Sequence, residues 1–320
     1  MWILYVLAGL LGFAVFAILA GGFAAYNMAL MRKKKKPVIQ NNPDPKAVVR
    51  QEKTKIGKEY LFGKNPEDVT LEARDGLVLK GWFLPAEKPS DKLVVFAHGY
   101  NCNGPDEFAA FIQFYHEALN YHILLPDHRA HGRSPGKFIG FAALEWRDIL
   151  DWADAYVNRL GPDTQVVLHG VSMGGATVMN CNANNPPDYV KCVVEDCGYT
   201  NGYEMISLAG RRDLGIRITP LYWAAALWFR LYTGKSLMKD SDPYGNISKF
   251  AKPTLFIHGA NDTFVPAEMG LRCYEAATVE KDLWLAEGAG HAQSYYLCQG
   301  EYEARLGAWL ERWMGERVTV

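Results

Sequence analysis

The feature that most constrains this chain is a serine held between a buried strand and a helix. Residues 164–169, Thr-Gln-Val-Val-Leu-His, form an apolar run rich in β-branched side chains, which predicts a buried strand. The sequence Gly170-Val171-Ser172-Met173-Gly174 follows, and then a segment that predicts a helix. A strand, a tight G-x-S-x-G turn and a helix form a nucleophile elbow. We therefore predict that Ser172 is a nucleophile, and that side chains at the two glycines would collide with the neighbouring strand and helix.

Two later strands lead into residues that could act together with this serine. The apolar run 253–258 is followed by Asp262, and the run 282–286 is followed by a glycine-rich loop that carries His291. A serine hydroxyl is a weak nucleophile until a base takes its proton. We expect His291 to be that base and Asp262 to orient and stabilise its imidazole. Three alternatives stay open: Asp262 as a helix cap, His291 as an ordinary loop histidine, and Asp196, beyond another strand, as the acid.

The sequence also predicts where a developing negative charge would be stabilised. Residues 92–97 predict a strand that leads directly into His98-Gly99-Tyr100. Enzymes with a nucleophile elbow take one oxyanion-hole donor from a loop in this position and another from the residue after the nucleophile. We therefore expect the oxyanion hole to consist of the backbone N–H groups of Tyr100 and Met173. We expect His98 to form hydrogen bonds within its loop rather than to transfer protons.

These motifs occur in the chain order serine, aspartate, histidine, and together they resemble the α/β-hydrolase superfamily, on its esterase, lipase and serine-peptidase side. The resemblance covers about residues 67–314. It includes residues 126–134, Pro-Asp-His-Arg-Ala-His-Gly-Arg-Ser, which are similar to the family's D-x-R-G-H-G-x-S segment. Ala130 replaces the usual glycine, a change expected to alter only a turn. The resemblance implies an α/β-hydrolase fold with a mostly parallel eight-stranded sheet, flanking helices and a helical cap insertion.

The alternation of apolar runs with helical patterns agrees with that fold. Strands are predicted near 93–97, 122–126, 165–169, 190–195, 253–258 and 282–286, and helices near 106–119, 143–159, 174–183, 267–277 and 300–314. Such alternation indicates a parallel sheet with crossover helices, and Asp75-Gly76 predicts a hairpin before it. We expect one catalytic domain over residues 67–320. A net charge of −1 gives no indication of a nucleic-acid partner, and neither a metal nor a cofactor is expected.

An insertion rich in aromatic and aliphatic side chains, about residues 199–250, lies between the sixth and seventh strands of that fold. In the family that the chain resembles, an insertion at this point covers the active site as a lid or cap. Residues 221–229 are wholly apolar, which exceeds what one buried helix face needs. We therefore expect either a wall that binds an acyl group or a cap that touches a membrane.

The N-terminus predicts a membrane anchor. Residues 1–31 contain no charged side chain, and Arg32-Lys33-Lys34-Lys35-Lys36 follow directly. At about 1.5 Å per residue, a helix of this length exceeds the roughly 30 Å thickness of the hydrocarbon. Trp2 and Tyr5 suit one interface and Tyr26 the other. A cleaved signal peptide is the alternative, although a basic leading region is missing. The positive-inside rule predicts a single-pass protein of the cell membrane with its catalytic domain in the cytoplasm.

Residues 32–66, with several lysines, prolines and asparagines, predict a basic and polar tether. We expect residues 1–36 to contact the bilayer, and the tether to keep the basic cluster remote from the active site. Four small residues recur at every fourth position in the anchor, namely Ala17, Gly21, Ala25 and Ala29. Such a face can pack against another membrane span.

The motifs together predict a membrane-anchored serine hydrolase that cleaves a carboxylic ester or a related small-molecule acyl substrate. An acyl-peptidase or a thioesterase would use the same triad. A catalytically idle hydrolase fold that serves as a binding module is the alternative from a different class. The sequence leaves the natural substrate, the acyl-chain length and the oligomeric state open.

Overall fold

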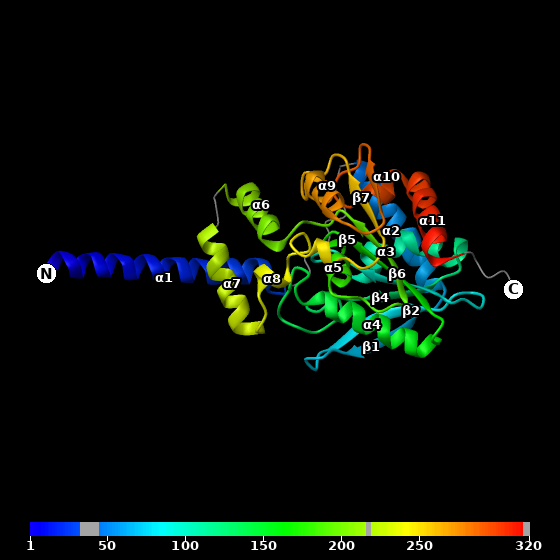
Figure 1. Ribbon diagram of the computed structural model, residues 1–320, viewed down its shortest axis with the longest axis horizontal. Coiled ribbons are helices and arrows are strands. Elements are labelled where there is room, and N and C mark those ends of the chain that lie inside the picture. Colours follow the sequence, from blue (N-terminus) through cyan, green and yellow to red (C-terminus); the bar gives the residue numbers. More distant parts are fainter. Residues whose placement is uncertain (33–44, 216–218, 316–320) are drawn as a thin grey trace.

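The computed structural model describes residues 1–32, 45–215 and 219–315, and the strands in these ranges form one eight-stranded sheet. The strands are β1 (Glu67–Glu72), β2 (Val78–Leu84), β3 (Lys92–Ala97), β4 (His122–Pro126), β5 (Gln165–Val171), β6 (Val190–Asp196), β7 (Thr254–Gly259) and β8 (Lys281–Ala286). Their order is β1-β2-β4-β3-β5-β6-β7-β8. Strand β2 pairs antiparallel with both of its neighbours, β1 and β4. All pairs among β3–β8 are parallel. The predicted architecture is confirmed (Figure 1).

Helices cover both faces of the sheet, which explains why its central strands are apolar throughout. The covering helices are α3 (Gly104–Gln113), α4 (Glu145–Leu160), α5 (Met173–Ala183), α9 (Ala267–Ala276), α10 (Ser294–Leu297) and α11 (Gln299–Met314). Alternate side chains of β3 enter different cores, since Val94 and Phe96 pack with α3 and α11, whereas Leu93 and Val95 pack with α4. The sheet therefore holds the ends of its strands in fixed positions.

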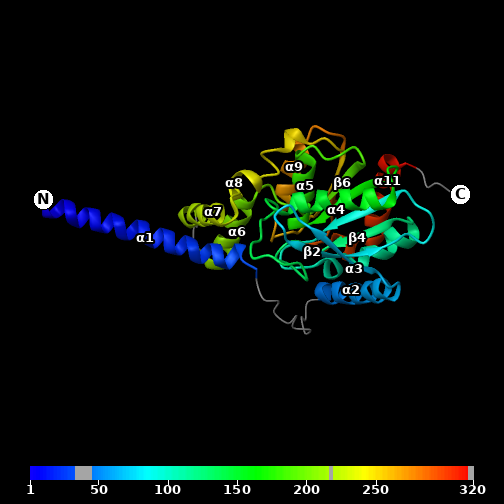
Figure 2. The same cartoon turned by 90° about the horizontal axis from the view of Figure 1, so that it is seen from below.

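Part of the predicted tether is instead a packed helix. Residues 45–63 form α2 (Pro45–Gly63), which lies along α3 (Figure 2). A Cβ atom at Gly57 would lie 2.2 Å from the carbonyl oxygen of Ala109, so the two backbones approach as closely as glycine allows. Arg50 also forms an ion pair with the buried carboxylate of Glu107 at 2.6 Å. The tether prediction is wrong for this segment. Its buried residues, Gly57 and Leu61, lie one turn apart and let a lysine-rich helix pack against α3. Residues 33–44 lie outside the described ranges.

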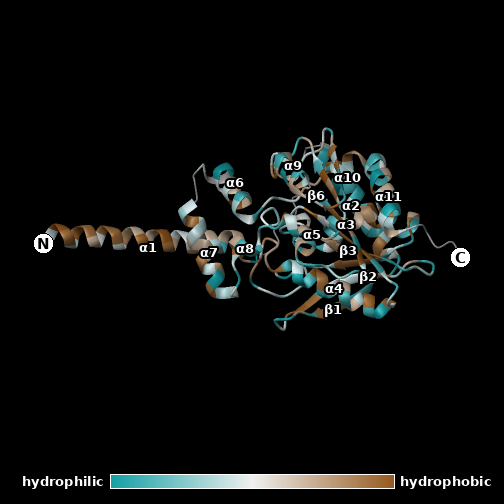
Figure 3. Cartoon of the chain, in the orientation of Figure 1, coloured by the Kyte–Doolittle hydropathy of each residue, from teal (hydrophilic) through white to brown (hydrophobic). Residues whose placement is uncertain are grey.

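The predicted anchor is a single helix, α1 (Trp2–Leu30), which projects away from the sheet (Figure 1). Within the described residues it is the one helix long and apolar enough to cross a membrane, judged by length and composition. Residues 2–18 are exposed. They measure about 26 Å along the helix axis, close to the thickness of a hydrocarbon layer. Figure 3 shows the apolar colour running along this part of the helix.

The C-terminal half of α1 packs against a helix of the same chain. It meets α7 (Thr219–Thr233), which forms the cap together with α6 (Gly202–Leu214) and α8 (Leu237–Asp240). A Cβ atom at Gly22 would lie 2.1 Å from the Cβ of Ala224, and Trp228 Nε1 donates to the carbonyl oxygen of Leu19 at 3.1 Å. A Cβ atom at Gly21 would lie 2.8 Å from Cδ2 of Leu221, so α7 occupies part of the small-residue face of α1 that could also have packed against another span.

This packing predicts that the C-terminal half of α1 contributes to the stability of the folded chain. Tyr26 and Leu30 are each 1% exposed, and burying two such side chains stabilises a protein by about 3–6 kcal/mol. Deleting residues 1–31 should lower the melting temperature in detergent by roughly 5–15 °C. Deleting only residues 2–18 keeps these contacts and serves as the matched control. Equal melting temperatures for the two deletion variants would contradict a structural role for the C-terminal half of α1.

Candidate active site

Ser172 occupies a strained turn between β5 and α5. Its backbone angles are φ 59° and ψ −118°, a conformation that costs a residue with a side chain about 1–3 kcal/mol. A Cβ atom at Gly170 would lie 2.1 Å from the carbonyl oxygen of Gly174, and one at Gly174 would lie 1.7 Å from that of Ala97. Both glycines therefore have the predicted steric role. The turn presents the serine at the carboxyl ends of the parallel strands.

The three predicted catalytic residues form one chain of hydrogen bonds. His291, in the loop after β8, has Nε2 2.9 Å from Ser172 Oγ. Its Nδ1 lies 2.7 Å from Asp262 Oδ2, in the loop after β7. An imidazole that donates from Nδ1 to the carboxylate leaves Nε2 able to accept the serine proton. The geometry thus allows the serine hydroxyl to be activated as a nucleophile.

Asp262 is held as a carboxylate. Its Oδ1 accepts the backbone N–H groups of Phe264 and Val265 at 2.8 and 2.9 Å. Burial alone raises the pKa of this carboxyl, but interactions with His258 and His291 outweigh that effect and hold the pKa well below its usual range. Asp262 does not cap α9, because the residue at the N-cap of that helix is Pro266.

The rival acid Asp196 lies at the end of β6 and has another partner. Its Oδ2 accepts a hydrogen bond from the Tyr302 hydroxyl at 3.0 Å. Burial raises the pKa of Asp196 to about 6, and it raises the pKa of the neighbouring Glu195 to about 7. Because the bond from His291 Nδ1 goes to Asp262, the geometry favours Asp262 as the triad acid.

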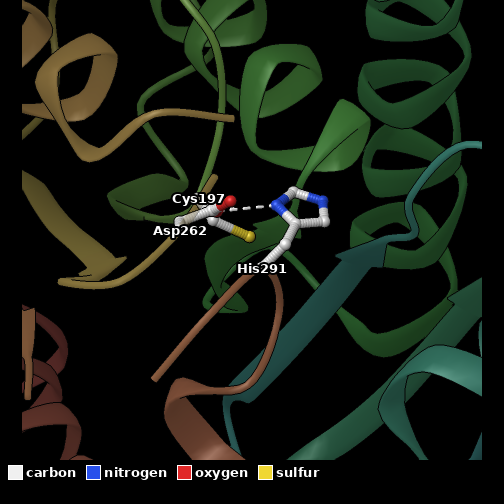
Figure 4. A group of neighbouring side chains, drawn as sticks. All are labelled: Cys197, Asp262 and His291. Carbon is white, nitrogen blue, oxygen red and sulfur yellow. Dashed lines mark hydrogen bonds and ion pairs between the residues drawn. The ribbon is translucent and has the colours of Figure 1, made fainter. Parts of the chain in front are cut away.

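Two residues beside the triad were missed by the sequence reasoning. The buried His258 has Nε2 3.4 Å from Asp262 Oδ2 and 2.9 Å from the carbonyl oxygen of Val265. The available signal was its place at the end of a strand, four residues before Asp262. Cys197, buried just beyond β6, has φ 48° and lies beside Asp262 and His291 (Figure 4). Its position follows from the sheet order and carries no sequence motif.

Cys197, Asp262 and His291 are the residues here that could offer ligands to a metal ion. One donor atom from each lies within 4.8 Å of the others. However, Asp262 and His291 are already hydrogen-bonded to each other at 2.7 Å. Burial also raises the pKa of the Cys197 thiol well above its usual value, whereas the thiolate is the form that binds metals. This donor set fits a proton-transfer site better than a metal site.

The loop after β3 reaches the nucleophile, as an oxyanion hole requires. A Cβ atom at Gly99 would lie 3.3 Å from the Cβ of Ser172. Tyr100 is the next residue along this loop, and Met173 is the first residue of α5. Both backbone segments therefore border Ser172. The use of the Tyr100 and Met173 N–H groups as oxyanion donors stays a prediction.

His98 forms buried hydrogen bonds that connect the loop after β3 to the loop after β4. His98 is fully buried, with Nδ1 2.8 Å from the Gly99 carbonyl oxygen. Its Nε2 accepts the backbone N–H of His128 at 2.9 Å, in agreement with the expected role within the loop. Ala130 has φ 61°, a left-handed conformation that glycine enters without strain. This conformation explains why glycine is usual at this position of the similar segment.

Helix α1 and the cap helix α7 share a buried cluster with the residue after the nucleophile. Met173 belongs to the same buried cluster as Tyr26 of α1 and Phe229 of α7. The Tyr100 hydroxyl donates to the carbonyl oxygen of Ala29 at 2.9 Å. Arg32 Nη1 donates to the carbonyl oxygen of Ser134 at 2.6 Å. The first residue of the basic cluster therefore packs on the loop after β4.

Comparisons with known proteins agree with this architecture. A family model described as "Alpha/beta hydrolase family" matches residues 94–305. The esterase Pf2001 of Pyrococcus furiosus has a similar structure, with a TM-score of 0.66 and 22% sequence identity over 80% of this chain and 94% of that one. At this identity the similarity concerns the fold.

Two curated relatives show how far the sequence similarity extends. The uncharacterized protein YqkD of Bacillus subtilis is 25% identical over 304 residues, which cover 94% of this chain and 95% of the relative. The lysophosphatidylserine lipase ABHD12 of Macaca fascicularis is 24% identical over 207 residues, which cover 61% of this chain. That match spans 48% of the length of the lipase.

Proposed function

Because this chain belongs to the alpha/beta hydrolase family, we propose that it is a membrane-anchored serine hydrolase that cleaves a carboxylic ester through an acyl-enzyme. One observation carries this proposal, the hydrogen-bonded path from the Ser172 hydroxyl through His291 to Asp262. These three groups supply the nucleophile, the base and the orienting carboxylate that acyl transfer needs. Family membership supports hydrolysis in general but does not identify the substrate, because one fold serves many substrates.

In the proposed reaction, His291 Nε2 takes the proton of Ser172 Oγ while the oxygen attacks the carbonyl carbon of the ester. The N–H groups of Tyr100 and Met173 donate to the oxyanion that forms. The imidazolium, stabilised by Asp262, then gives its proton to the leaving alcohol oxygen as the C–O bond breaks. Water, deprotonated by His291, attacks the acyl-enzyme, and the carboxylic acid leaves as the serine regains its proton.

We propose that the substrate is an ester of a lipid or of a similarly amphiphilic alcohol. A support is the apolar cap, in which Phe229 of α7 shares a buried cluster with Met173, the residue after the nucleophile. The match to a relative named as a lysophosphatidylserine lipase also agrees with an amphiphilic ester, although this chain matches only about half of that protein. The cluster places apolar residues of the cap next to the nucleophile elbow, which would suit an apolar acyl group.

The proposed anchoring places the cap at the bilayer surface. Helix α7 runs across the axis of α1 (Figure 1). Trp223, Leu227 and Leu231 lie four residues apart along α7, and each is exposed. A helix parallel to the membrane can bury such a face in the interface. The basic residues 32–36 after the span favour a cytoplasmic catalytic domain.

The proposal is tested on the full chain in detergent with a fluorophosphonate probe and p-nitrophenyl esters of graded chain length. We expect covalent labelling at Ser172 and a kcat/KM that rises from acetate toward medium-length acyl chains. Neither labelling nor turnover would favour an idle binding module. Faster cleavage of a thioester or an acyl-peptide than of the matched ester would favour a thioesterase or an acyl-peptidase, which share the same triad.

A further inference from the structure

A basic cavity lies at the junction of the anchor helix, the cap and the loop after β4. Its volume is about 1020 Å³. Six of its lining residues are cationic, namely Arg32, Arg74, Arg129, Lys137, Arg147 and Lys235. Two are carboxylates, Asp75 and Asp148. The proposed triad and the expected oxyanion donors are not among the lining residues, so this cavity is distinct from the candidate active site.

The two carboxylates leave most of this positive charge uncompensated. Arg129 alone engages both, through one nitrogen 2.7 Å from Asp75 Oδ2 and two nitrogens each 2.7 Å from an oxygen of Asp148. Arg74 pairs with Asp151, outside the cavity lining. Within the ranges that the structure describes, Lys137, Arg147 and Lys235 form no salt bridge. The cavity therefore presents cations to any ligand that enters it.

Arg147 lies among these cations, and no carboxylate in the described ranges forms a salt bridge with it. Its guanidinium donates to the carbonyl oxygen of Ala143 at 3.3 Å and lies over the ring of Trp146. Burial lowers the pKa of Arg147. Among the nearby charges, Asp240 and Asp148 raise this pKa, while Arg74 and Arg129 lower it. A bound anion would offset the repulsion from Arg74 and Arg129, because opposite charges in a partly buried site attract strongly.

The cavity lies at the end of the helix that the proposed function places in the membrane, which favours a lipid as the source of that anion. Arg32 is the second residue after α1, and Tyr232 and Thr233 are the last two residues of α7. With the exposed residues 2–18 in the hydrocarbon, Tyr26 and Arg32 lie beyond the layer, on the side of the membrane that carries the folded domain. Leu77, Phe138 and Leu144 add apolar lining that suits the glycerol and upper acyl carbons.

We propose that this cavity binds the phosphate-bearing head group of an anionic phospholipid. The inference rests on the membrane anchoring in the proposed function, but not on its catalytic part. Lys137 and Lys235 are the cations to test, because a bound phosphate would compensate the charge of each. A lipid held here would fix the cap and the C-terminal end of α1 against the bilayer surface.

Native mass spectrometry of the full chain in a neutral detergent tests the proposal. The titrants are phosphatidylglycerol, phosphatidylcholine and inorganic phosphate. We expect one phosphatidylglycerol to bind at least about tenfold more tightly than phosphatidylcholine, because each basic residue near an anionic lipid adds to its attraction. The double variant Lys137→Gln/Lys235→Gln should lose about tenfold in that affinity.

The matched control is Lys88→Gln/Lys191→Gln, which removes the same charge near the amino ends of β3 and β6, at the sheet edge opposite Ser172. It should bind phosphatidylglycerol like the wild type. Fluorophosphonate labelling should be unchanged in every variant, which separates failure of this proposal from failure of the catalytic one. Equal affinity for the two lipids, an undiminished affinity in the double variant, or inorganic phosphate that binds as tightly as phosphatidylglycerol would overturn the lipid site.

Discussion

Replacing Ser172 with alanine should lower ester turnover by a factor on the order of 10⁶, as expected when the nucleophile of a triad is removed. The variant loses the Oγ atom that lies 2.9 Å from His291 Nε2, so no acyl-enzyme can form. Labelling by a fluorophosphonate probe should disappear with it. The measurement is kcat/KM for the best p-nitrophenyl ester, together with gel-based detection of the probe.

The fold should survive this change. Alanine enters the φ 59° conformation at about the same cost as serine, since both carry a Cβ atom. The melting temperature should therefore stay close to that of the wild type. Strong covalent labelling of a folded Ser172→Ala protein would place the nucleophile elsewhere in the chain.

Replacing Asp262 with asparagine should lower turnover by about 10⁴, because the histidine tautomer is no longer controlled. The asparagine Oδ1 can still accept the N–H groups of Phe264 and Val265, which keeps the loop in place. Its amide NH₂, however, would face His291 Nδ1 and favour the tautomer that carries its proton on Nε2. Such an imidazole cannot accept the proton of Ser172.

Asp196→Asn provides the matched comparison for this prediction. Asp196 is buried and hydrogen-bonded to Tyr302, and its replacement removes a carboxylate of the same size close to the site. We expect a far smaller loss of kcat/KM, with a melting temperature that reports any structural damage. If the two losses were reversed, Asp196 would be the triad acid.

The order of the catalytic residues along the chain could be predicted because strand ends carry local signals. The elbow around Ser172 combines a β-branched run, two glycines and a helix start, all within one short segment. Asp262 and His291 each follow an apolar run that predicts a strand. Since carboxyl ends of neighbouring parallel strands meet at one edge of a sheet, these patterns sufficed to predict that a histidine and an acid after such strands would lie near Ser172.

The choice between Asp262 and Asp196 required the tertiary structure. Both carboxylates follow predicted strands, so the sequence alone left the acid open. The order of β6, β7 and β8 in the sheet and the loop that carries His291 decide which one faces the imidazole. His258 and Cys197 were missed for the same reason, because their nearness to Asp262 depends on how separate strands pack.

The sequence by itself determined the apolar length of α1, the elbow and the alternation of strands with helices, because each depends on neighbours in the chain. Only the tertiary structure decided what α1 touches. Its small residues were compatible with another span, yet one of them, Gly21, packs against Leu221 of α7, beside the contact between Gly22 and Ala224. Similarly, residues 45–63 have the composition of a tether but dock along α3. Packing partners depend on surfaces that exist only after distant segments have folded together, and no local pattern encodes which surface will be presented.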